Sequence, residues 1–577
     1  MRLPRTAAIA STLFALALAE PPPAGPGAVQ LSATKKHIGD NASKDFSPGS
    51  PDGREWSEAC PALPQLPPGL FWGLVAQVRH VADANNRDYE QGGYVDEVRI
   101  DGAAVARLND YVGPESSAAH EVWVPLPEAK LRQGMRISVT AGKDVNSANL
   151  DDFEIGEVRL APMRRIEVRT GGPAKVLVKG APRLGPEYVA RAATRGAFTA
   201  DGKAELLLPA DGTFTITVSH GPEFEVATAE IAPWAKDPLT VQPKRAFETP
   251  GMFSADLHVH ADPSSDSRVP LTDRVTGHLA EGVEWVVATD HNRATDYGPA
   301  IRALGVGDLI RSSIGDEITS QKPRIGHFNV FPVAAAVDVK DMTARTLLDR
   351  VPRDGRVLQV NHGRDSGIGY FELFKFDPET LKSPDPDFHL KFDAMEVLNG
   401  KSDPRALGLL LRDWYAMLNA GVRITATGNS DSHRLVLEDG GWPRNYVITG
   451  KEGFPTEAEF VAAVRAQHLV ISCGPVLDLR DGSGRSVVGE ELKAATVDLT
   501  IRMRTPSWAP VKRLLLIENG KTKQSLEPLQ EQKVTLAPEK DAWYVVIAEG
   551  EKFEADVVTH GRLRPWGMTN PVWIRRP

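Results

Sequence analysis

Nine histidines and carboxylates in the middle of the chain are of the types that bind metal ions. In chain order they are His258, His260, Asp266, His291, Glu317, His327, His362, Asp431 and His433. In an extended strand, residues i and i+2 point to the same side, so the imidazoles of His258 and His260 can reach one ion. The Asp431-x-His433 spacing does the same. Mixed imidazole and carboxylate ligation suits Zn, Mn or Fe.

Each of these residues also has an ordinary explanation when it is taken alone. The pair His258 and His260 could be two polar residues on an exposed strand face. Asp262 and Asp266 lie in a turn-forming loop, where either could be a turn residue or a helix cap. The prediction of a metal site therefore depends on the repetition of the pattern along the chain.

Polar residues directly follow apolar, strand-like segments at several places. The examples are Asp290 and His291 after residues 285–288, Glu317 after 310–314, His362 and Arg364 after 357–360, Asn399 after 394–398, and Asp431 and His433 after 424–427. These strands alternate with amphipathic helices, which predicts parallel βα units in an α/β barrel or sheet. The catalytic groups of such folds lie where the strands end. We therefore expect these side chains to meet in one cluster.

A cluster of this kind has a direct chemical use. Bound ions lower the pKa of a coordinated water toward ~7 and stabilise negative charge that develops on the substrate. We predict hydrolysis without a covalent intermediate. The sequence has no Gly-x-Ser-x-Gly elbow that would suggest a serine nucleophile.

Further candidates follow from their positions beside the metal motifs. Asp290 could orient a ligating histidine, as carboxylates commonly do. Arg364 and Arg444 could meet an anionic substrate or the charge that develops on it, which makes Arg364 a catalytic candidate as well. An ordinary structural or surface role is the alternative for both arginines. Asn399, followed by Lys401, is a substrate-binding candidate at another strand end.

The order and local context of the metal motifs resemble those of the PHP (polymerase and histidinol phosphatase) superfamily. Within it, residues 253–475 are most similar to the CehA/McbA-like branch, named after carbaryl hydrolase. The resemblance implies a PHP-type distorted (β/α)7 barrel over residues 248–476. It also implies two to three divalent ions (Zn, Mn or Fe), held in three ligand sets: His258, His260, Glu317 and Asp431; the bridging Glu317 with His327 and His362; and Asp266, His291 and His433. Glu317 and Asp431 are, on this resemblance, the central catalytic carboxylates. Many members of the family have a histidine where this chain has Asp266.

The regions that flank the predicted barrel have the spacing of β-domains. Short apolar runs between turns predict a jelly-roll-like β-sandwich over residues 65–163, and period-2 alternation predicts a small immunoglobulin-like domain over 164–247. Residues 477–577 return to strands and predict a C-terminal β-sandwich. The segment 151–155 resembles jelly-roll carbohydrate-binding modules, so the first sandwich could bind glycan or serve only as a scaffold. The fold class is therefore multidomain, with an α/β barrel flanked by β-sandwiches.

The first residues have the pattern of a signal peptide. Arg2 and Arg5 precede an apolar run over 7–18, and Ala19 offers a cleavage site. A membrane anchor is the alternative, but the run is shorter than the ~20 apolar residues that span a bilayer. Residues 1–19 thus predict a periplasmic or extracellular protein without integral membrane association. The Pro/Gly-rich residues 20–64 predict a flexible linker.

Composition excludes some classes of partner and ligand. The formal net charge is -9 and no Lys/Arg-rich run occurs, which argues against nucleic-acid binding. The two cysteines, Cys60 and Cys473, form no Cys-x-x-Cys pair, so metal ligands must be nitrogen and oxygen. They could form a disulfide or be two unrelated thiols.

Together these observations predict an exported metal-dependent hydrolase that acts on a small-molecule ester. A phosphoester substrate and a carboxyl ester or carbamate are both compatible with the motif residues, because one water-activating cluster can serve either. A secreted glycan-binding protein with a decayed site is the alternative from a different class. The complete set of ligand-type residues argues against that alternative.

Overall fold

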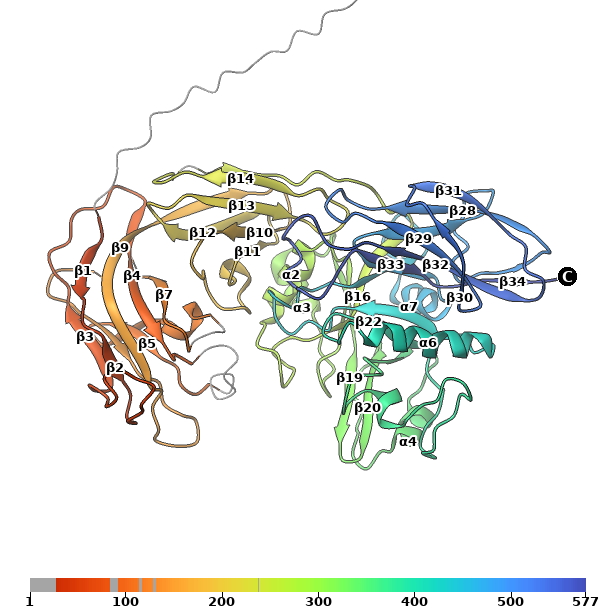
Figure 1. Cartoon of the computed structure of the whole chain (residues 1–577), viewed down its shortest axis with the longest axis horizontal. Coiled ribbons are helices and arrows are strands. Elements are labelled where there is room, and N and C mark those ends of the chain that lie inside the picture. Colours follow the sequence, from red (N-terminus) through yellow and green to blue (C-terminus); the bar gives the residue numbers. More distant parts are fainter. Residues whose placement is uncertain (1–26, 83–91, 114–116, 128–130, 237) are drawn as a thin grey trace, which may run out of the picture.

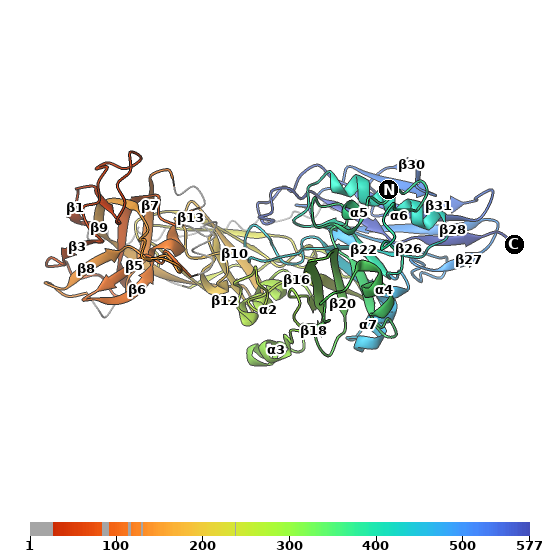
Figure 2. The ribbon, with the colours of Figure 1, turned by 90° about the horizontal axis from the view of Figure 1, so that it is seen from below.

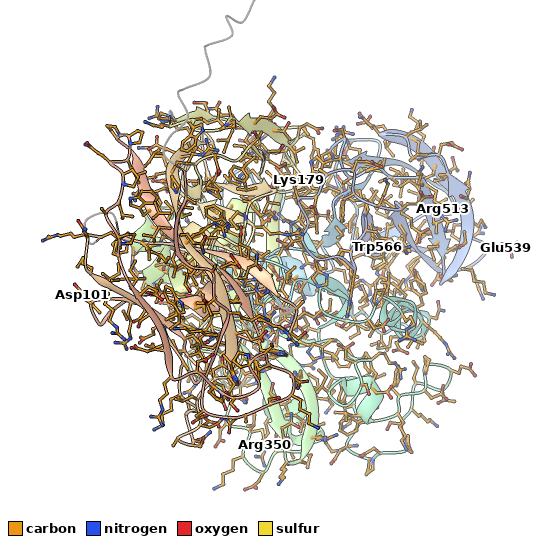
Figure 3. All side chains as sticks on the ribbon, turned by 60° about the vertical axis from the view of Figure 1, so that its left-hand side comes forward. Asp101, Lys179, Arg350, Arg513, Glu539 and Trp566 are labelled. Carbon is orange, nitrogen blue, oxygen red and sulfur yellow. The ribbon has the colours of Figure 1, made fainter. Side chains whose placement is uncertain are left out.

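Sheets dominate the computed structural model, which describes residues 27–82, 92–113, 117–127, 131–236 and 238–577. The predicted signal peptide, residues 1–19, lies outside this range. The chain runs from an N-terminal pair of sheets at one end of the molecule to C-terminal strands at the other (Figures 1 and 2). Figure 3 labels Asp101 in the first of these regions and Arg513 in the last. Among the described residues, no helix is both long enough and apolar enough to cross a membrane.

Two sheets enclose the first core. One has the order β1 (Val29–Ser32), β9 (Phe153–Arg169), β4 (Leu70–Arg79), β7 (His120–Pro125), with β2 (Lys36–Ile38) also on β9. The other has the order β3 (Glu55–Ala59), β8 (Arg136–Thr140), β5 (Glu97–Ile100), β6 (Ala103–Arg107), and η1 (Leu108–Tyr111) follows it. Period-2 alternation turns Val122 and Val124 of β7 inward. Residues 29–59, expected in a flexible linker, instead supply β1, β2 and β3, because their backbone groups pair with β9 and β8.

The long strand β9 continues from the first core into a second one. Its later half pairs with β12 (Lys203–Pro209) and β15 (Leu239–Thr240). A second sheet packs against it in the order β11 (Gly196–Thr199), β10 (Ala174–Lys179), β13 (Phe214–Ser219), β14 (Ala227–Ile231), beside the short helix η2 (Ala190–Ala192). One continuous strand therefore joins the two N-terminal units.

The middle of the chain builds two further sheets. The larger has the order β18 (Arg311–Ile314), β17 (Trp285–Ala288), β16 (Met252–Val259), β24 (Arg444–Ile448), β25 (Leu469–Cys473), β33 (Trp566–Thr569), β32 (Ala542–Glu549), β29 (Arg513–Glu518), β30 (Lys521–Leu526). The smaller has the order β19 (Asp316–Gln321), β20 (Arg324–Phe331), β21 (Val357–Val360), β22 (Ala394–Asn399), β23 (Thr425–Asn429). The helices of this region are α2 (Leu271–Ala280), α3 (Gly298–Leu304), α4 (Ala344–Arg350), α5 (Tyr370–Leu373), α6 (Ala406–Asn419) and α7 (Glu457–Arg465).

The (β/α)7 barrel expected for residues 248–476 is wrong. In such a barrel each strand is parallel to its neighbours and is followed by a helix. Here β16 runs antiparallel to β24, β24 to β25, and β20 to both β19 and β21. A turn of two residues joins β19 to β20, which leaves no room for a crossover helix. Within residues 248–476, parallel pairing joins only β16–β17–β18 and β21–β22–β23.

The larger sheet does not close on itself but continues into the C-terminal strands. β25 pairs with β33, so one sheet spans the domain boundary expected near residue 476. The remaining C-terminal strands are β26 (Val476–Arg480), β28 (Val497–Arg504) and β31 (Glu531–Leu536) in one small sheet, and β27 (Glu491–Lys493) with β34 (Val572–Arg575) beside β32. Cys60 and Cys473 are free, buried thiols in separate cores, which resolves the alternatives left by the sequence.

A buried ion cluster ties the second N-terminal unit to the rest of the molecule. Lys175 on β10 contacts the carboxylate of Glu281, just after α2. Its Nζ also lies 3.1 Å from Oδ1 of Asp439 and 2.5 Å from the carbonyl oxygen of Val557. All three charged side chains are almost completely buried. Segments from three parts of the chain therefore meet at one lysine.

Candidate metal centre

The nine predicted ligand residues lie together where the two central sheets meet. His258 is on β16 and His260 follows it, while Glu317 and His327 are on the hairpin β19–β20. The others follow strand ends or stand in loops. Two isolated bridges, Val259 with Ser432 and His291 with Glu317, fasten one sheet to the other at this point. The cluster therefore lies at the junction of the two sheets rather than inside a closed barrel.

Four overlapping groups have donor atoms within 4.8 Å of one another. They are His260, Asp266, His291 and His433; His258, His362 and Asp431; His258, His260 and Glu317; and His291, Glu317 and His327. Every residue predicted as a ligand belongs to at least one group. His260 stands with the third predicted set as well as with the first, which the sequence did not indicate.

The spacing around His258 and His260 fits ligands of a common ion. Their Nε2 atoms are 3.1 Å apart, and each lies 3.3 to 3.4 Å from a carboxylate oxygen of Glu317 and of Asp431. With ligands ~2.0–2.1 Å from zinc, two ligand atoms are about 3.0 Å apart at a right angle and about 3.4 Å apart at the tetrahedral angle. All of these atoms are nitrogen or oxygen, the donor types that Zn, Mn and Fe accept.

Glu317 divides its two oxygens between different histidines. Oε1 lies 3.1 Å from His327 Nδ1 and 3.5 Å from His362 Nε2, whereas Oε2 lies 3.0 Å from His291 Nδ1. Oε1 also accepts a hydrogen bond of 2.9 Å from the amide of Asn361. Both oxygens of Glu317 would therefore be available to hold a metal cluster.

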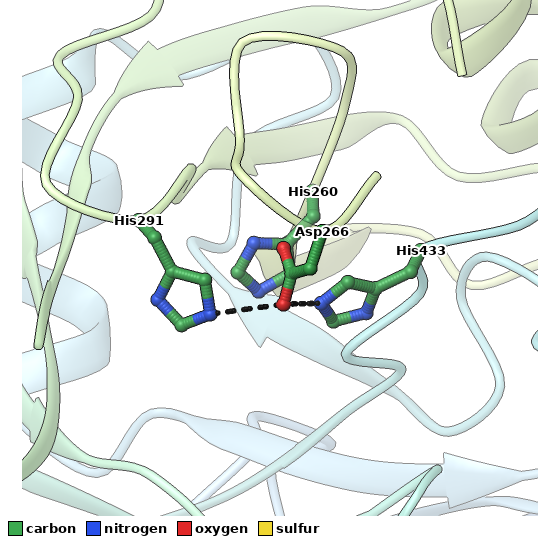
Figure 4. Close-up of side chains that lie close together, drawn as sticks. All are labelled: His260, Asp266, His291 and His433. Atoms are coloured by element: carbon green, nitrogen blue, oxygen red, sulfur yellow. Dashed lines mark hydrogen bonds and ion pairs between the residues drawn. The ribbon is translucent and has the colours of Figure 1, made fainter. Parts of the chain in front are cut away.

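Asp266 reaches the cluster from the loop before α2. Its Oδ2 lies 3.0 Å from His433 Nε2 and 3.2 Å from His291 Nε2 (Figure 4). The ring of His433 stacks on that of His260 with centroids 4.0 Å apart. Asp266 is 45% exposed, whereas His433 is nearly buried. The third predicted ligand set therefore lies at the open side of the cluster.

The carboxylates and imidazoles of the cluster shift one another's pKa values. Burial alone would raise the pKa of Glu317, but His291 and His258 outweigh it and hold that pKa well below its usual range. Burial would lower the pKa of His291, but Glu317 and Asp266 raise it to about 11. Asp431 likewise has a strongly lowered pKa, because His258 and Lys401 outweigh its burial. The carboxylates are therefore ionised, the state in which they bind metal ions.

Two of the predicted ligand residues have backbone conformations that non-glycine residues seldom adopt. Asp431 has φ of 52° and His362 has φ of 30°. Such conformations cost about 1 to 3 kcal/mol each and occur most often at functional sites. Here they turn the chain immediately after β23 and β21, so that both side chains face the cluster.

Glu396 on β22 supports the cluster and was missed in the sequence. Its Oε1 lies 2.8 Å from Nδ1 of His258, which leaves Nε2 of that ring for a metal ion. Its Oε2 accepts 2.7 Å and 2.9 Å hydrogen bonds from the backbone of His362 and the amide of Asn399. Glu396 is completely buried. A single charged residue inside an apolar strand was the signal that could have identified it.

We expect the substitution Glu396→Gln to weaken metal binding by about 10- to 100-fold, the usual effect of removing a partner that orients a ligating histidine. The amide keeps the size of the side chain but loses the charge that fixes the His258 ring. Competition with a chelator of known affinity measures the change. Glu379→Gln, at an exposed ion pair with Arg412, is the matched control. Equal affinities for the two variants would contradict the assigned role.

The remaining predicted residues separate into two groups. Asn399 lies at the cluster, where its amide nitrogen is 3.2 Å from Asp431 Oδ2. Asp290 accepts a 2.7 Å hydrogen bond from the backbone of Ala261, so it holds the turn after His260. Burial raises the pKa of Asp290 to about 6. The prediction was that Asp290 orients a ligating histidine, but within the described ranges no hydrogen bond joins it to an imidazole of the cluster.

The structure does not bring Arg364 or Arg444 to the cluster, contrary to the prediction. Arg364 donates two 2.7 Å hydrogen bonds to the carboxylate of Asp413 on α6. Its guanidinium is therefore directed away from His362, the predicted ligand in the same loop. Arg444 is buried on β24 and donates to the carbonyl oxygens of Gly441 and Glu281. Both are structural arginines in this fold, the alternative that the sequence had left open.

Lys401 is the cation that does stand at the cluster. It is an exposed residue of the loop after β22, and its Nζ lies 3.1 Å from His433 Nδ1. An ammonium group at the open side of the site can attract an anionic substrate.

No protein-family model matches this chain, and no curated protein matches it. Solved structures that match include the FMN-binding beta-glucuronidase from Facaelibacterium prausnitzii L2-6, at 9% identity over 95% of this chain and 98% of that chain, with a TM-score of 0.20. A Bacteroides uniformis beta-glucuronidase matches at 8% identity over 95% of this chain and 80% of that chain, with a TM-score of 0.18. Similarity at these TM-scores carries no argument about fold or function.

Proposed function

We propose that this chain is a metal-dependent hydrolase related to the PHP superfamily, which uses two to three divalent ions (Zn, Mn or Fe) to activate water against a phosphoester. The observation that carries the proposal is the convergence of nine nitrogen and oxygen ligands with the mutual spacing of ligands around shared ions. The resemblance of the metal motifs supports the same reaction class. Export through residues 1–19 belongs to the same proposal.

The side chains of the cluster have separate tasks in this reaction. The chemistry supplied by bound ions is acidification of a water molecule and attraction of the substrate oxygen. Glu317 and Asp431 contribute negative charge that holds the ions together. Glu396 and Asn399 keep His258 and Asp431 in place through hydrogen bonds. Lys401 attracts the anionic group of the substrate at the open side.

Lys401 favours a phosphoester over the alternative, a carboxyl ester or carbamate. A phosphate group carries negative charge in both the substrate and the product, so a nearby ammonium group aids its capture. A neutral ester gains nothing from that charge until its transition state forms. The charge at the open side therefore distinguishes two substrate classes that the metal ligands alone do not.

An assay of hydrolysis tests the proposal. It uses the chain without residues 1–19, loaded separately with Zn, Mn and Fe. We expect turnover of an aryl phosphate to exceed that of the matched aryl ester and aryl carbamate. Asp431→Ala should abolish turnover, while the exposed Asp354→Ala should not change it. Failure of the protein to bind any of the three metals would contradict the proposal. A clear preference for the neutral substrates would replace the phosphoester with the ester or carbamate class.

A further inference from the structure

A pocket lies between the second N-terminal unit and the central sheets. Its volume is about 500 Å³, within the ~300–1,000 Å³ range of small-molecule sites. Residues 220–224, after β13, and residues 245–251, before β16, form one side of it, and the end of α2, residues 282–284, β16 and β24 form the other. None of the nine predicted metal ligands lines it. The pocket is therefore a candidate site that is separate from the metal centre.

Acidic side chains outnumber basic ones around this pocket. Its lining includes five glutamates and three cations. All three cations already have partners: Arg245 lies 2.5 Å from a carboxylate oxygen of Glu223, Lys451 contacts the carboxylate of Glu459, and Arg444 donates to two backbone carbonyl oxygens. The wall therefore carries a net negative charge, which favours a cationic ligand.

Glu284 is a half-buried carboxylate of this wall that has no ion pair among the described residues. Its Oε2 accepts a 2.9 Å hydrogen bond from the backbone of Ser254. Burial raises the pKa of Glu284 to about 7, and the charge of Glu223 adds to the shift, although Arg245 and Arg444 oppose it. A cation that enters the pocket would compensate this carboxylate.

Tyr446 supplies a second polar group. The side chain is completely buried, and no hydrogen bond from the described residues reaches its hydroxyl. Burial raises the pKa of Tyr446, and the neighbouring carboxylate of Glu223 raises it further. A buried hydroxyl without a hydrogen bond is unfavourable unless a bound molecule supplies the partner. An ammonium group has three N–H donors, so it can donate to this hydroxyl and to carboxylates at the same time.

We propose that this pocket binds an organic ammonium ion, which donates to Glu284 and Tyr446 and lays a short apolar chain against the wall. Leu279 and Val283 are buried apolar residues of that wall, and Leu309 is exposed at its edge. These apolar groups and the volume favour an organic cation over a single inorganic ion. The negative charge of the wall disfavours a carboxylate or a phosphate. The inference does not depend on the proposed hydrolase function.

The ligand would contact both sides of the junction. Glu223 belongs to the second N-terminal unit, whereas Glu284 and Tyr446 belong to the central region. Glu281, which also lines the pocket, contacts Lys175 of the second N-terminal unit. Because a ligand that binds only the folded state stabilises it, an ammonium ion in this pocket should hold the two parts of the chain together.

Calorimetry with the full chain tests the proposal with three probes that share one alkyl chain. We expect butylammonium to bind at least tenfold more tightly than butyrate or 1-butanol. Glu284→Gln should weaken butylammonium binding at least tenfold, because the amide can still accept from Ser254 but has no charge. Leu309→Lys, at an exposed position of the edge, should also weaken it without affecting folding. Glu551→Gln, an exposed glutamate elsewhere, is the matched control and should leave binding unchanged.

Thermal unfolding gives a second readout. Butylammonium should raise the melting temperature of the unsubstituted chain but not that of the Glu284→Gln chain. Butylammonium binding that is absent, no tighter than that of butyrate or 1-butanol, or unchanged by Glu284→Gln would overturn the proposal. Calcium binding that is lost in Glu284→Gln, in a chain that does not bind butylammonium, would assign the pocket to an inorganic cation and would overturn it as well. Hydrolysis of an aryl phosphate should change less than twofold in Glu284→Gln, so failure of this proposal and failure of the proposed function are distinguishable.

Discussion

The substitution Glu317→Gln is expected to lower kcat/KM by about three orders of magnitude and to reduce the metal content of the purified chain. Glu317 contacts five of the histidines, and both of its oxygens are used. The neutral amide keeps the volume and can still accept the hydrogen bond from Asn361. It removes the charge that would hold the metal ions of the proposed function, which is worth several kcal/mol. Each ~1.4 kcal/mol changes the rate about tenfold.

Elemental analysis of metal per chain and steady-state kinetics measure the two effects. Glu372→Gln, at an exposed position of α5, is the matched control and should retain both metal and activity. Thermal unfolding of the two variants, each with excess metal and after chelation, shows whether the cluster still binds ions that stabilise the fold. A Glu317→Gln chain that retains full metal and more than half of its activity would contradict the bridging role of the carboxylate.

The candidate site was easier to predict from the sequence than the fold around it. The spacing His258-x-His260 fixes the direction of both side chains as soon as the segment is extended, whatever strand lies beside it. Glu317 and Asp431 were identified because they follow apolar strands. These are local properties of the chain, and the structure brings all nine residues together.

Strand direction depends on contacts between distant segments, so local patterns in the sequence did not predict it. An apolar run such as β25 has the same pattern whether its neighbours are parallel or antiparallel. The alternation of strands and helices suggested only the parallel case. The short edge strands β1 and β3 were hidden by surrounding prolines and glycines. Their pairing with β9 and β8, more than a hundred and about eighty residues away respectively, makes them visible only in the structure.

Arg364 shows the same limit at the level of one side chain. Its place two residues after His362 suggested the active site. The positive φ of His362 turns the chain there, and the guanidinium pairs with Asp413, which is 49 residues away. Lys401, at a strand end that had seemed less informative, is the cation that the fold places at the cluster.

The second large effect is expected from Lys175→Ala, which should reduce the free energy of unfolding by about 3 to 5 kcal/mol. The substitution leaves the carboxylates of Glu281 and Asp439 buried without their shared cation. Lys179→Ala, at an exposed position of the same strand labelled in Figure 3, should change stability by no more than about 0.5 kcal/mol. Urea denaturation measures the free energy of unfolding of both variants. The signal should report on the junction between the second N-terminal unit and the central sheets.

Charge and packing contributions at Lys175 can be separated by a compensated variant. Lys175→Met combined with Glu281→Gln and Asp439→Asn removes all three charges at nearly constant volume, and should recover much of the stability lost in Lys175→Ala.

The contribution of Lys175 to the free energy of unfolding should also depend on pH, with a defined sign. Burial would lower the pKa of Lys175, but Asp439 and Glu281 outweigh it and raise that pKa. The stabilisation is therefore complete below the ordinary lysine pKa of about 10.4 and is lost only as pH rises through the higher folded value. A stability difference between Lys175→Ala and the unsubstituted chain that is below 1 kcal/mol at pH 7 would show that the three parts of the chain are held together without this ion cluster.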